Sequence, residues 1–220
     1  MARLAMFDMD RTLLKKETAS LYVRYQREIG EATTRDLLRT LGWVFQYTVG
    51  TLDMNRVAKK ALSTLEGMPE IDMATRCDDW FRRSVERHIA DGGRLAVKRH
   101  QAKGDVCAIV TGASLYVSRP LARILGIPHV VASVFEVDED GIFTGRAAPP
   151  LCFGEGKLAR ATALADSLGL SLDDAVFYSD SASDLPLLER VGEPVAVNPD
   201  KKLAKVARDR GWRVETWYWR

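Results

Sequence analysis

Cysteine and histidine are both scarce in this 220-residue chain, which contains three of each. The cysteines are scattered and the histidines isolated, so neither type shows the short paired spacing of a disulfide framework or a zinc site. An odd, scattered cysteine count without a signal peptide is typical of proteins in a reducing compartment. We therefore predict a cytoplasmic location and assign these residues no role.

Long apolar runs and an excess of one charge are also lacking. The nearest approach to a membrane span, at 41–52, is interrupted by Gln46 and Gly50, whereas a spanning helix needs about 20 apolar residues. The 32 basic and 30 acidic residues leave a net charge of +2, which gives no electrostatic reason to expect nucleic acid. We expect a small-molecule partner, no nucleic acid and no membrane span, and the sequence leaves the oligomeric state open.

Short apolar runs alternate along the chain with longer helical patterns. Continuous apolar runs of this length are typical of parallel strands that are covered on both faces. The runs lie at 4–7, 106–110, 129–135, 175–178 and 194–197, and the helical patterns at 115–125, 156–168, 184–190 and 201–210. The alternation predicts an α/β fold with an open parallel sheet flanked by helices.

Two segments depart from this alternation. Residues 15–87 contain amphipathic helical patterns and no convincing strand, so we interpret them as an inserted helical cap. The core would then comprise 1–14 and 88–220. The second segment, 134–146, has Asp140-Gly141 between alternating runs, which predicts a β-hairpin. The aromatic residues at 217–219 are expected to pack against an edge strand.

Polar side chains gather where the predicted strands end. In an open α/β sheet, ligands bind at the carboxyl ends of the strands, so segments far apart in sequence would converge on one pocket. The polar residues at these ends are Asp8, Asp10, Thr12, Thr111, Asp180, Ser183 and Asp184.

Phosphoryl transfer chemistry can be built from these groups. Asp8 is a carboxylate of the kind that forms aspartyl-phosphate intermediates. Asp10 would point to the same side of an extended chain and could protonate a leaving group, then accept a proton from water. Several aspartates beside a phosphate need a cation, and hard oxygen ligands suit Mg²⁺. Thr111 offers a hydroxyl and N–H donors, and Lys157 offers a positive charge.

Four motifs in this order resemble those of the haloacid dehalogenase-like superfamily. They are Asp8-Met9-Asp10-Arg11-Thr12-Leu13, Thr111-Gly112, Lys157 and Asp180-Ser181-Ala182-Ser183-Asp184. The helical segment after the first motif is similar to the subclass that includes phosphoserine phosphatase. This resemblance spans essentially the whole chain and implies a Rossmann-like core with a helical cap.

The resemblance also implies roles for individual residues. Asp8 would be the nucleophile and a metal ligand, and Asp10 the acid/base and a ligand through its main-chain carbonyl. Asp180 would be the third protein ligand of Mg²⁺, and Asp184 would orient metal-bound waters or Lys157. The residues expected to bind phosphate or substrate in the core are Thr111, Gly112, Lys157 and Ser183.

Cap residues in the resembling subclass read the leaving group of the substrate. Glu17 matches a glutamate that binds an ammonium group, and Lys59, with Arg56 nearby, falls where an arginine binds a carboxylate. The family often has Asn in place of Ser183, and Gly or Ser-Gly-Gly in place of Thr111-Gly112-Ala113. These departures leave the reaction unchanged and leave the substrate open.

The sequence therefore predicts a Mg²⁺-dependent phosphoric monoester hydrolase that acts on a small organic phosphate through an aspartyl-phosphate on Asp8. A phosphotransferase of the same family, which passes the phosphoryl group to an acceptor other than water, is the first alternative. A non-catalytic protein that binds a phosphate ligand is the second. The presence of both Asp8 and Asp10 favours the enzymes.

Overall fold

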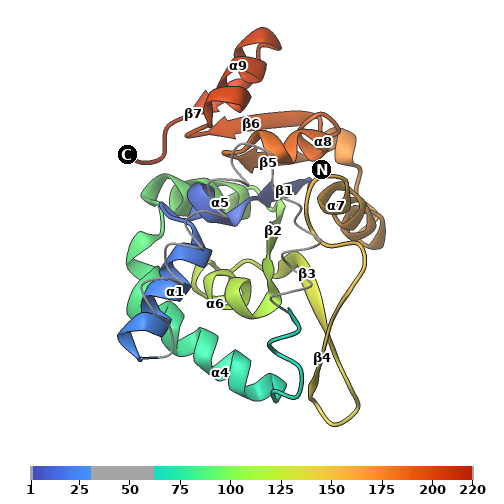
Figure 1. Ribbon diagram of the computed structural model, residues 1–220. Coiled ribbons are helices and arrows are strands. Elements are labelled where there is room, and N and C mark those ends of the chain that lie inside the picture. Colours follow the sequence, from blue (N-terminus) through green and yellow to red (C-terminus); the bar gives the residue numbers. More distant parts are fainter. Residues whose placement is uncertain (1, 31–61, 220) are drawn as a thin grey trace.

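The computed structural model describes residues 2–30 and 62–219, which form a seven-stranded sheet with helices on both faces (Figure 1). The strand order is β4-β3-β2-β1-β5-β6-β7. Neighbouring strands are parallel except for the antiparallel pair β3–β4. The strands are β1 Leu4–Phe7, β2 Val106–Ser114, β3 His129–Val137, β4 Phe143–Ala148, β5 Val176–Ser179, β6 Glu193–Val197 and β7 Arg213–Glu215. The predicted open parallel sheet and the hairpin are confirmed.

Successive side chains of β1 point to opposite faces of the sheet, and each face has its own core. Ala5 and Phe7 pack with α5 (Asp91–Ala102) and α6 (Leu115–Leu125). Leu4 and Met6 pack on the other face with α7 (Glu155–Ser167), α8 (Leu185–Leu188) and α9 (Lys201–Asp209). All four β1 side chains are fully buried, as the continuous apolar run predicts for a central strand.

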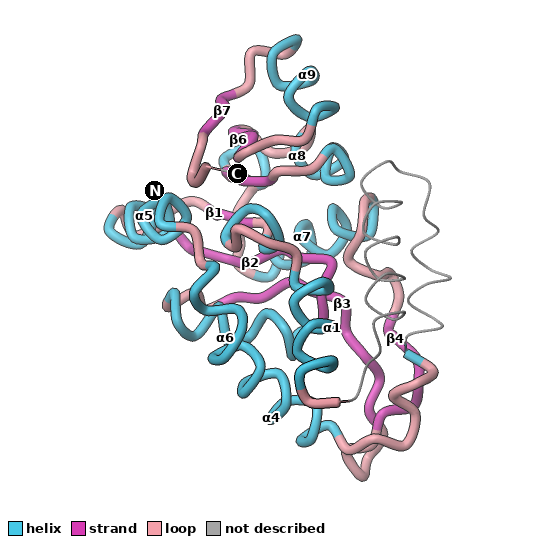
Figure 2. Tube along the Cα trace, turned by 60° about the vertical axis from the view of Figure 1, so that its left-hand side comes forward, coloured by secondary structure: helices cyan, strands magenta, loops and turns pink. Residues whose placement is uncertain are grey.

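The described parts of the 15–87 segment are mainly helical. They contain α1 (Thr18–Glu28) and α4 (Glu70–Trp80), followed by helical turns at Phe81–Val85 and Glu86–His88. In both views α1, α4 and the β3–β4 hairpin lie at the opposite end of the molecule from α9 (Figures 1 and 2). The two ends of the segment meet, because Lys15 N–H donates to the carbonyl of His88 at 2.8 Å. Arg56, Lys59 and the 41–52 stretch lie outside the described residues.

Two local features differ from the sequence-based expectations. Strand β2 continues beyond its predicted end at residue 110 as far as Ser114, through a register shift against β3. Trp217 and Tyr218 are buried beside the edge strand β7, but Trp219 is 92% exposed, so that part of the expectation was wrong. None of the helices in the described ranges is long and apolar enough to cross a membrane.

Candidate active site

The turn that follows β1 begins at Asp8, whose N–H donates to the carbonyl of Tyr178 in β5 at 2.8 Å. The chain stays extended at Asp8 (ψ 156°) and at Asp10 (ψ 129°), and then reverses at Arg11, which has a positive φ of 58°. Few non-glycine residues adopt this left-handed conformation, so other contacts must hold it. The turn closes when Leu14 N–H donates to the carbonyl of Met9 at 2.9 Å.

Lys157 joins two carboxylates that come from different strand ends. Its Nζ lies 2.8 Å from Oδ1 of Asp8 and 2.8 Å from a carboxylate oxygen of Asp184. The Ser179 hydroxyl also donates to Asp184 Oδ2, at 2.7 Å, which further restrains this carboxylate. All four side chains are buried, so the fold brings the predicted residues Asp8, Lys157 and Asp184 into direct contact.

The loop before α7 sets the position of Lys157. Gly156 leaves no room for a side chain, since a Cβ there would lie 2.0 Å from the carbonyl oxygen of Leu151. Gly154 has a positive φ of 48° and directly precedes the helix. The two glycines therefore let the helix begin close to the sheet, which brings Lys157 to the buried carboxylates.

Asp10 is held by the first residue of α1. Its Oδ1 accepts a hydrogen bond from Thr18 N–H, and its Oδ2 accepts one from the Thr18 hydroxyl, both at 2.9 Å. The carboxylate therefore receives two donors from a single residue and has a defined orientation. The buried hydroxyl of Thr12, in the same turn, has no hydrogen-bond partner within the described part of the chain.

Asp180 and Glu17 meet at the side chain of Arg11. The Arg11 Nε lies 3.5 Å from Asp180 Oδ2, and a terminal nitrogen of the same guanidinium lies 3.5 Å from Glu17 Oε1. The chain after Asp180 is held by Asp200, which begins α9. One Asp200 oxygen accepts from Ala182 N–H at 2.9 Å, and the other accepts from Leu203 N–H at 2.7 Å.

Thr111 and Gly112 occupy the end of β2, where contacts with other elements restrain them. The Thr111 hydroxyl oxygen accepts from Ala113 N–H at 3.2 Å, and the carbonyl of Gly112 accepts from the Ser133 hydroxyl at 3.2 Å. A Cβ at Gly112 would lie 2.1 Å from the ring of Phe153, so only glycine fits. In the fourth motif, the Ser183 hydroxyl lies 2.9 Å from that of Ser181.

Burial and mutual repulsion raise the pKa values of the carboxyl groups. Burial raises the pKa of Asp8 to about 6, with Lys157 opposing the change and Asp184 adding to it. The pKa of Asp10 rises to about 7 through burial and the charge of Asp8, against the bonds from Thr18. Burial and Asp8 raise the pKa of Asp180 well above its usual value, although Arg11 opposes this. Negative charge is therefore in excess at this site.

A divalent cation fits this donor set. The clustered carboxylates of Asp8, Asp10, Asp180 and Asp184 face only the positive charges of Lys157 and Arg11 in the contacts above. No three His, Cys, Asp or Glu side chains in residues 2–30 and 62–219 form a metal-binding group by themselves. The expected set of Mg²⁺ ligands contains only two side chains, those of Asp8 and Asp180, and its third protein ligand is the main-chain carbonyl of Asp10. Carboxylate and carbonyl oxygens with excess negative charge are the donors that suit Mg²⁺.

Four residues with clear structural roles were missed by sequence reasoning. Arg11 lay inside the first motif, but its long side chain gave no sign that it would join Asp180 to Glu17. Thr18 and Asp200 both precede or begin a helical pattern, and their capping residue types were the available signal. Ser179 carried no signal, because a serine at a strand end is common.

Comparison with known proteins agrees with the geometry. Residues 5–189 match the sequence model of the haloacid dehalogenase-like hydrolases. A histidinol-phosphatase of Neisseria meningitidis serogroup C is 30% identical, with 97% of this chain and 98% of that protein covered. The phosphoserine phosphatase SerB1 of Mycobacterium tuberculosis is 33% identical, with 96% of this chain and 69% of that protein covered.

Solved structures show the same fold. A Bordetella pertussis protein described as having unknown function has a TM-score of 0.88 at 31% identity, covering 99% of this chain and all of that one. A substrate-bound phosphoserine phosphatase has a TM-score of 0.72 at 20% identity, covering 99% of this chain and 94% of that one. The chain belongs to the haloacid dehalogenase-like hydrolase family. The predicted family and enzyme class are confirmed.

Proposed function

We propose that this protein is a Mg²⁺-dependent phosphomonoesterase that forms an aspartyl-phosphate on Asp8. The observation that carries the proposal is the buried contact of Asp8 with Lys157, which Asp184 holds in turn. A buried lysine beside a strand-end carboxylate supplies positive charge where the substrate phosphate and the nucleophile must approach each other. Membership of the hydrolase family supports the same reaction class.

The reaction proceeds in two steps. An oxygen of Asp8 bonds to phosphorus while the bond from phosphorus to the ester oxygen breaks, and Asp10 gives its proton to that oxygen. Asp10 then takes a proton from water, whose oxygen attacks the phosphorus and breaks the bond to Asp8. A pKa of about 7 suits Asp10 to both transfers at neutral pH.

The remaining core residues bind and orient. Thr111, Gly112, Lys157 and Ser183 are proposed to contact the phosphate. Asp8, Asp180 and the main-chain carbonyl of Asp10 would hold the cation, which when bound would neutralise phosphate oxygens facing these carboxylates. Asp184 holds Lys157 by direct contact.

We propose residues 15–87 as a cap over this site and 1–14 with 88–220 as the core. The contacts between residues 14–15 and 88–89 support these limits, since an inserted unit leaves and re-enters a core at one place. Glu17 lies shortly after the turn formed by residues 8–14, which we call the catalytic turn, and it pairs with Arg11 of that turn. This position supports a role in binding the leaving group of the substrate. Lys59 and Arg56 remain candidates for the same role.

The named relatives suggest a substrate class. Histidinol phosphate and phosphoserine are both phosphate esters of 2-amino alcohols, and such a substrate would present an ammonium group near the ester oxygen. A Glu17 carboxylate oxygen is a suitable acceptor for that group. We therefore propose phosphorylated 2-amino alcohols as the substrates.

A phosphate-release screen with Mg²⁺ tests the proposal. The panel contains histidinol phosphate, phosphoserine, phosphoethanolamine, a sugar phosphate, a nucleoside monophosphate and 4-nitrophenyl phosphate, with Asp8→Asn as the matched control. Release from the amino-alcohol esters by the wild type alone supports the assignment. Equal release by folded Asp8→Asn, or none from any ester by the wild type, contradicts it. Added alcohols that become phosphorylated would instead reveal a phosphotransferase.

A further inference from the structure

The C-terminal segment 215–218 crosses from the edge of the sheet to the catalytic turn. Asn198, at the end of β6, holds it at three points. Asn198 N–H donates to the carbonyl of Glu215 at 2.9 Å, its Oδ1 accepts from Trp217 N–H at 2.9 Å, and its Nδ2 donates to the carbonyl of Tyr218 at 2.7 Å. The left-handed backbone of Asn198 (φ 42°) is one that asparagine tolerates better than most residues. This segment is therefore a fixed part of the core.

Trp217 anchors the segment in the core beside β1, the strand that ends directly before Asp8. Its ring centroid lies 5.3 Å from that of Tyr178 and 6.5 Å from that of Phe7, the residue before Asp8. A Cβ on Gly92 would lie 2.6 Å from the Trp217 side chain, so α5 approaches the indole as closely as its backbone allows. The segment cannot shift without disturbing β1 or α5.

Tyr218 connects this anchored segment to the turn. Its hydroxyl donates to the main-chain carbonyl of Arg11 at 2.6 Å, across 207 residues of sequence. Arg11 is the residue with the positive φ, and its side chain pairs with Asp180 and Glu17. Tyr218 is 9% exposed, whereas the next residue, Trp219, is 92% exposed, so ordered packing of the segment stops at Tyr218.

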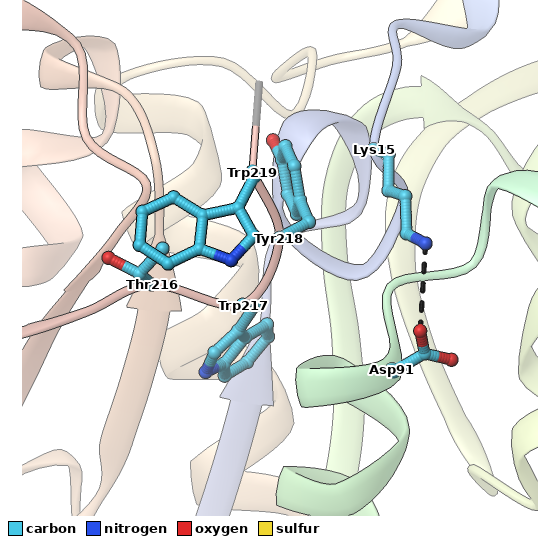
Figure 3. A pocket seen from close by; sticks show the side chains of 6 residues that line it. All are labelled: Lys15, Asp91, Thr216, Trp217, Tyr218 and Trp219. Atoms are coloured by element: carbon cyan, nitrogen blue, oxygen red, sulfur yellow. Dashed lines mark ion pairs between the residues drawn. The ribbon is translucent and has the colours of Figure 1, made fainter.

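We propose that Tyr218 is a positioning residue that holds the catalytic turn through the Arg11 carbonyl. The hydroxyl fixes the peptide plane after Arg11, and the left-handed turn directs the Arg11 side chain towards Asp180. The inference rests on the proposed function, since it gives the C-terminal segment a part in that reaction. In Figure 3, Trp217, Tyr218 and Trp219 lie on one side of a pocket, and the ion pair of Lys15 with Asp91 lies on the other side. We assign no ligand to this pocket, because none of the catalytic carboxylates lines it.

The variant Tyr218→Phe removes the hydroxyl and keeps the buried ring. We expect kcat to fall about tenfold, the order of effect of one lost hydrogen bond, with KM changed by less than about twofold. Amide hydrogen exchange in a peptide covering residues 9–14 should become faster in the same variant. This second readout needs no turnover and reports on the turn itself.

Two control variants separate positioning from stability. Tyr25→Phe removes a hydroxyl that donates to Asp79 at 3.3 Å, away from the turn, and Trp219→Ala changes the neighbouring exposed residue. Both should keep wild-type kcat and wild-type exchange at residues 9–14. The double variant Tyr218→Phe/Arg11→Gln should have the same kcat as Arg11→Gln alone. Once the Arg11 guanidinium is absent, the Tyr218 hydroxyl has no side chain left to position.

The possible results are distinct. Unchanged kcat and unchanged exchange in Tyr218→Phe would overturn the inference while the proposed function stands. If the fold-losses in kcat of the two single variants multiply in the double variant, the inference is also overturned, since Tyr218 would then not act through Arg11. A wild type that is inactive on every ester contradicts the proposed function, and the exchange experiment then decides the inference alone.

Discussion

Replacing Asp10 with asparagine should separate the two steps of the reaction. The structure indicates that the fold will tolerate the change, because the asparagine oxygen can accept from Thr18 N–H and its amide can donate to the Thr18 hydroxyl oxygen. The variant loses only the ability to give or take a proton. Its melting temperature should therefore stay close to that of the wild type.

The size of the effect follows from the role of Asp10. Loss of a general acid–base group costs about 10²–10⁴-fold, or about 3–5 kcal/mol of transition-state stabilisation. Because a pKa of about 7 leaves Asp10 able to donate and accept near neutral pH, we expect about 10³-fold on an alkyl phosphate. With 4-nitrophenyl phosphate the leaving group needs no proton, so the first step should be almost unaffected.

Rapid-mixing measurements of nitrophenolate release give the decisive assay. Asp10→Asn should release about one nitrophenolate per active site in a burst and then turn over slowly, since water is no longer deprotonated in the second step. Thr18→Val, which removes one donor to Asp10 but keeps the carboxyl group, should show no burst and only a modest loss. Equal losses on alkyl and nitrophenyl esters without a burst would refute the acid–base role.

Three further outcomes are expected. Activity should require Mg²⁺ and be inhibited by Ca²⁺, which takes more ligands at longer distance, as titration from EDTA-treated enzyme would show. Glu17→Gln should lower kcat/KM about tenfold for amino-alcohol phosphates and spare 4-nitrophenyl phosphate, because Glu17 is a partly exposed charge; equal losses would mean structural support. Burial lowers the pKa of His100 despite its bond to Asp105, so His100 binds fewer protons in the folded state, and the stability it contributes should fall as pH drops below about 6.5. The carboxyl groups with raised pKa values act in the opposite direction, so the test compares variants: the stability difference between wild type and His100→Gln in denaturant titrations should shift against the wild type from pH 7.5 to 5.5.

The parts of the site that could be predicted are those set by strand ends. The apolar run 4–7 predicts a buried strand, and its abrupt end places Asp8 at the carboxyl edge of the sheet. The same reasoning places Thr111 and Asp180 at this edge. These positions follow from local sequence because burial of a continuous apolar run determines where the polar residue after it must lie.

The parts that could not be predicted depend on contacts between distant segments. The left-handed backbone of Arg11 is unfavourable for a side chain of its size, so local preference argues against it. The Tyr218 hydroxyl, from the other end of the chain, binds the carbonyl of that residue. The pairing of Glu17 with Arg11 depends on this same turn, and nothing in the sequence indicated that this carboxylate would meet an arginine.

The catalytic turn is restrained by hydrogen bonds to several separate elements of the fold. Asp8 N–H is bonded to β5, the Asp8 carboxylate to Lys157 of α7, the Asp10 carboxylate to Thr18 of α1, and the Arg11 carbonyl to Tyr218. Because each bond leaves a different atom of the turn, loss of one leaves the others in place, and the fold should survive each single deletion. The chemistry should be less tolerant, since Asp8 and Asp10 must face one phosphorus atom within a fraction of an ångström. Variants in these contacts should therefore lower kcat more than they lower stability.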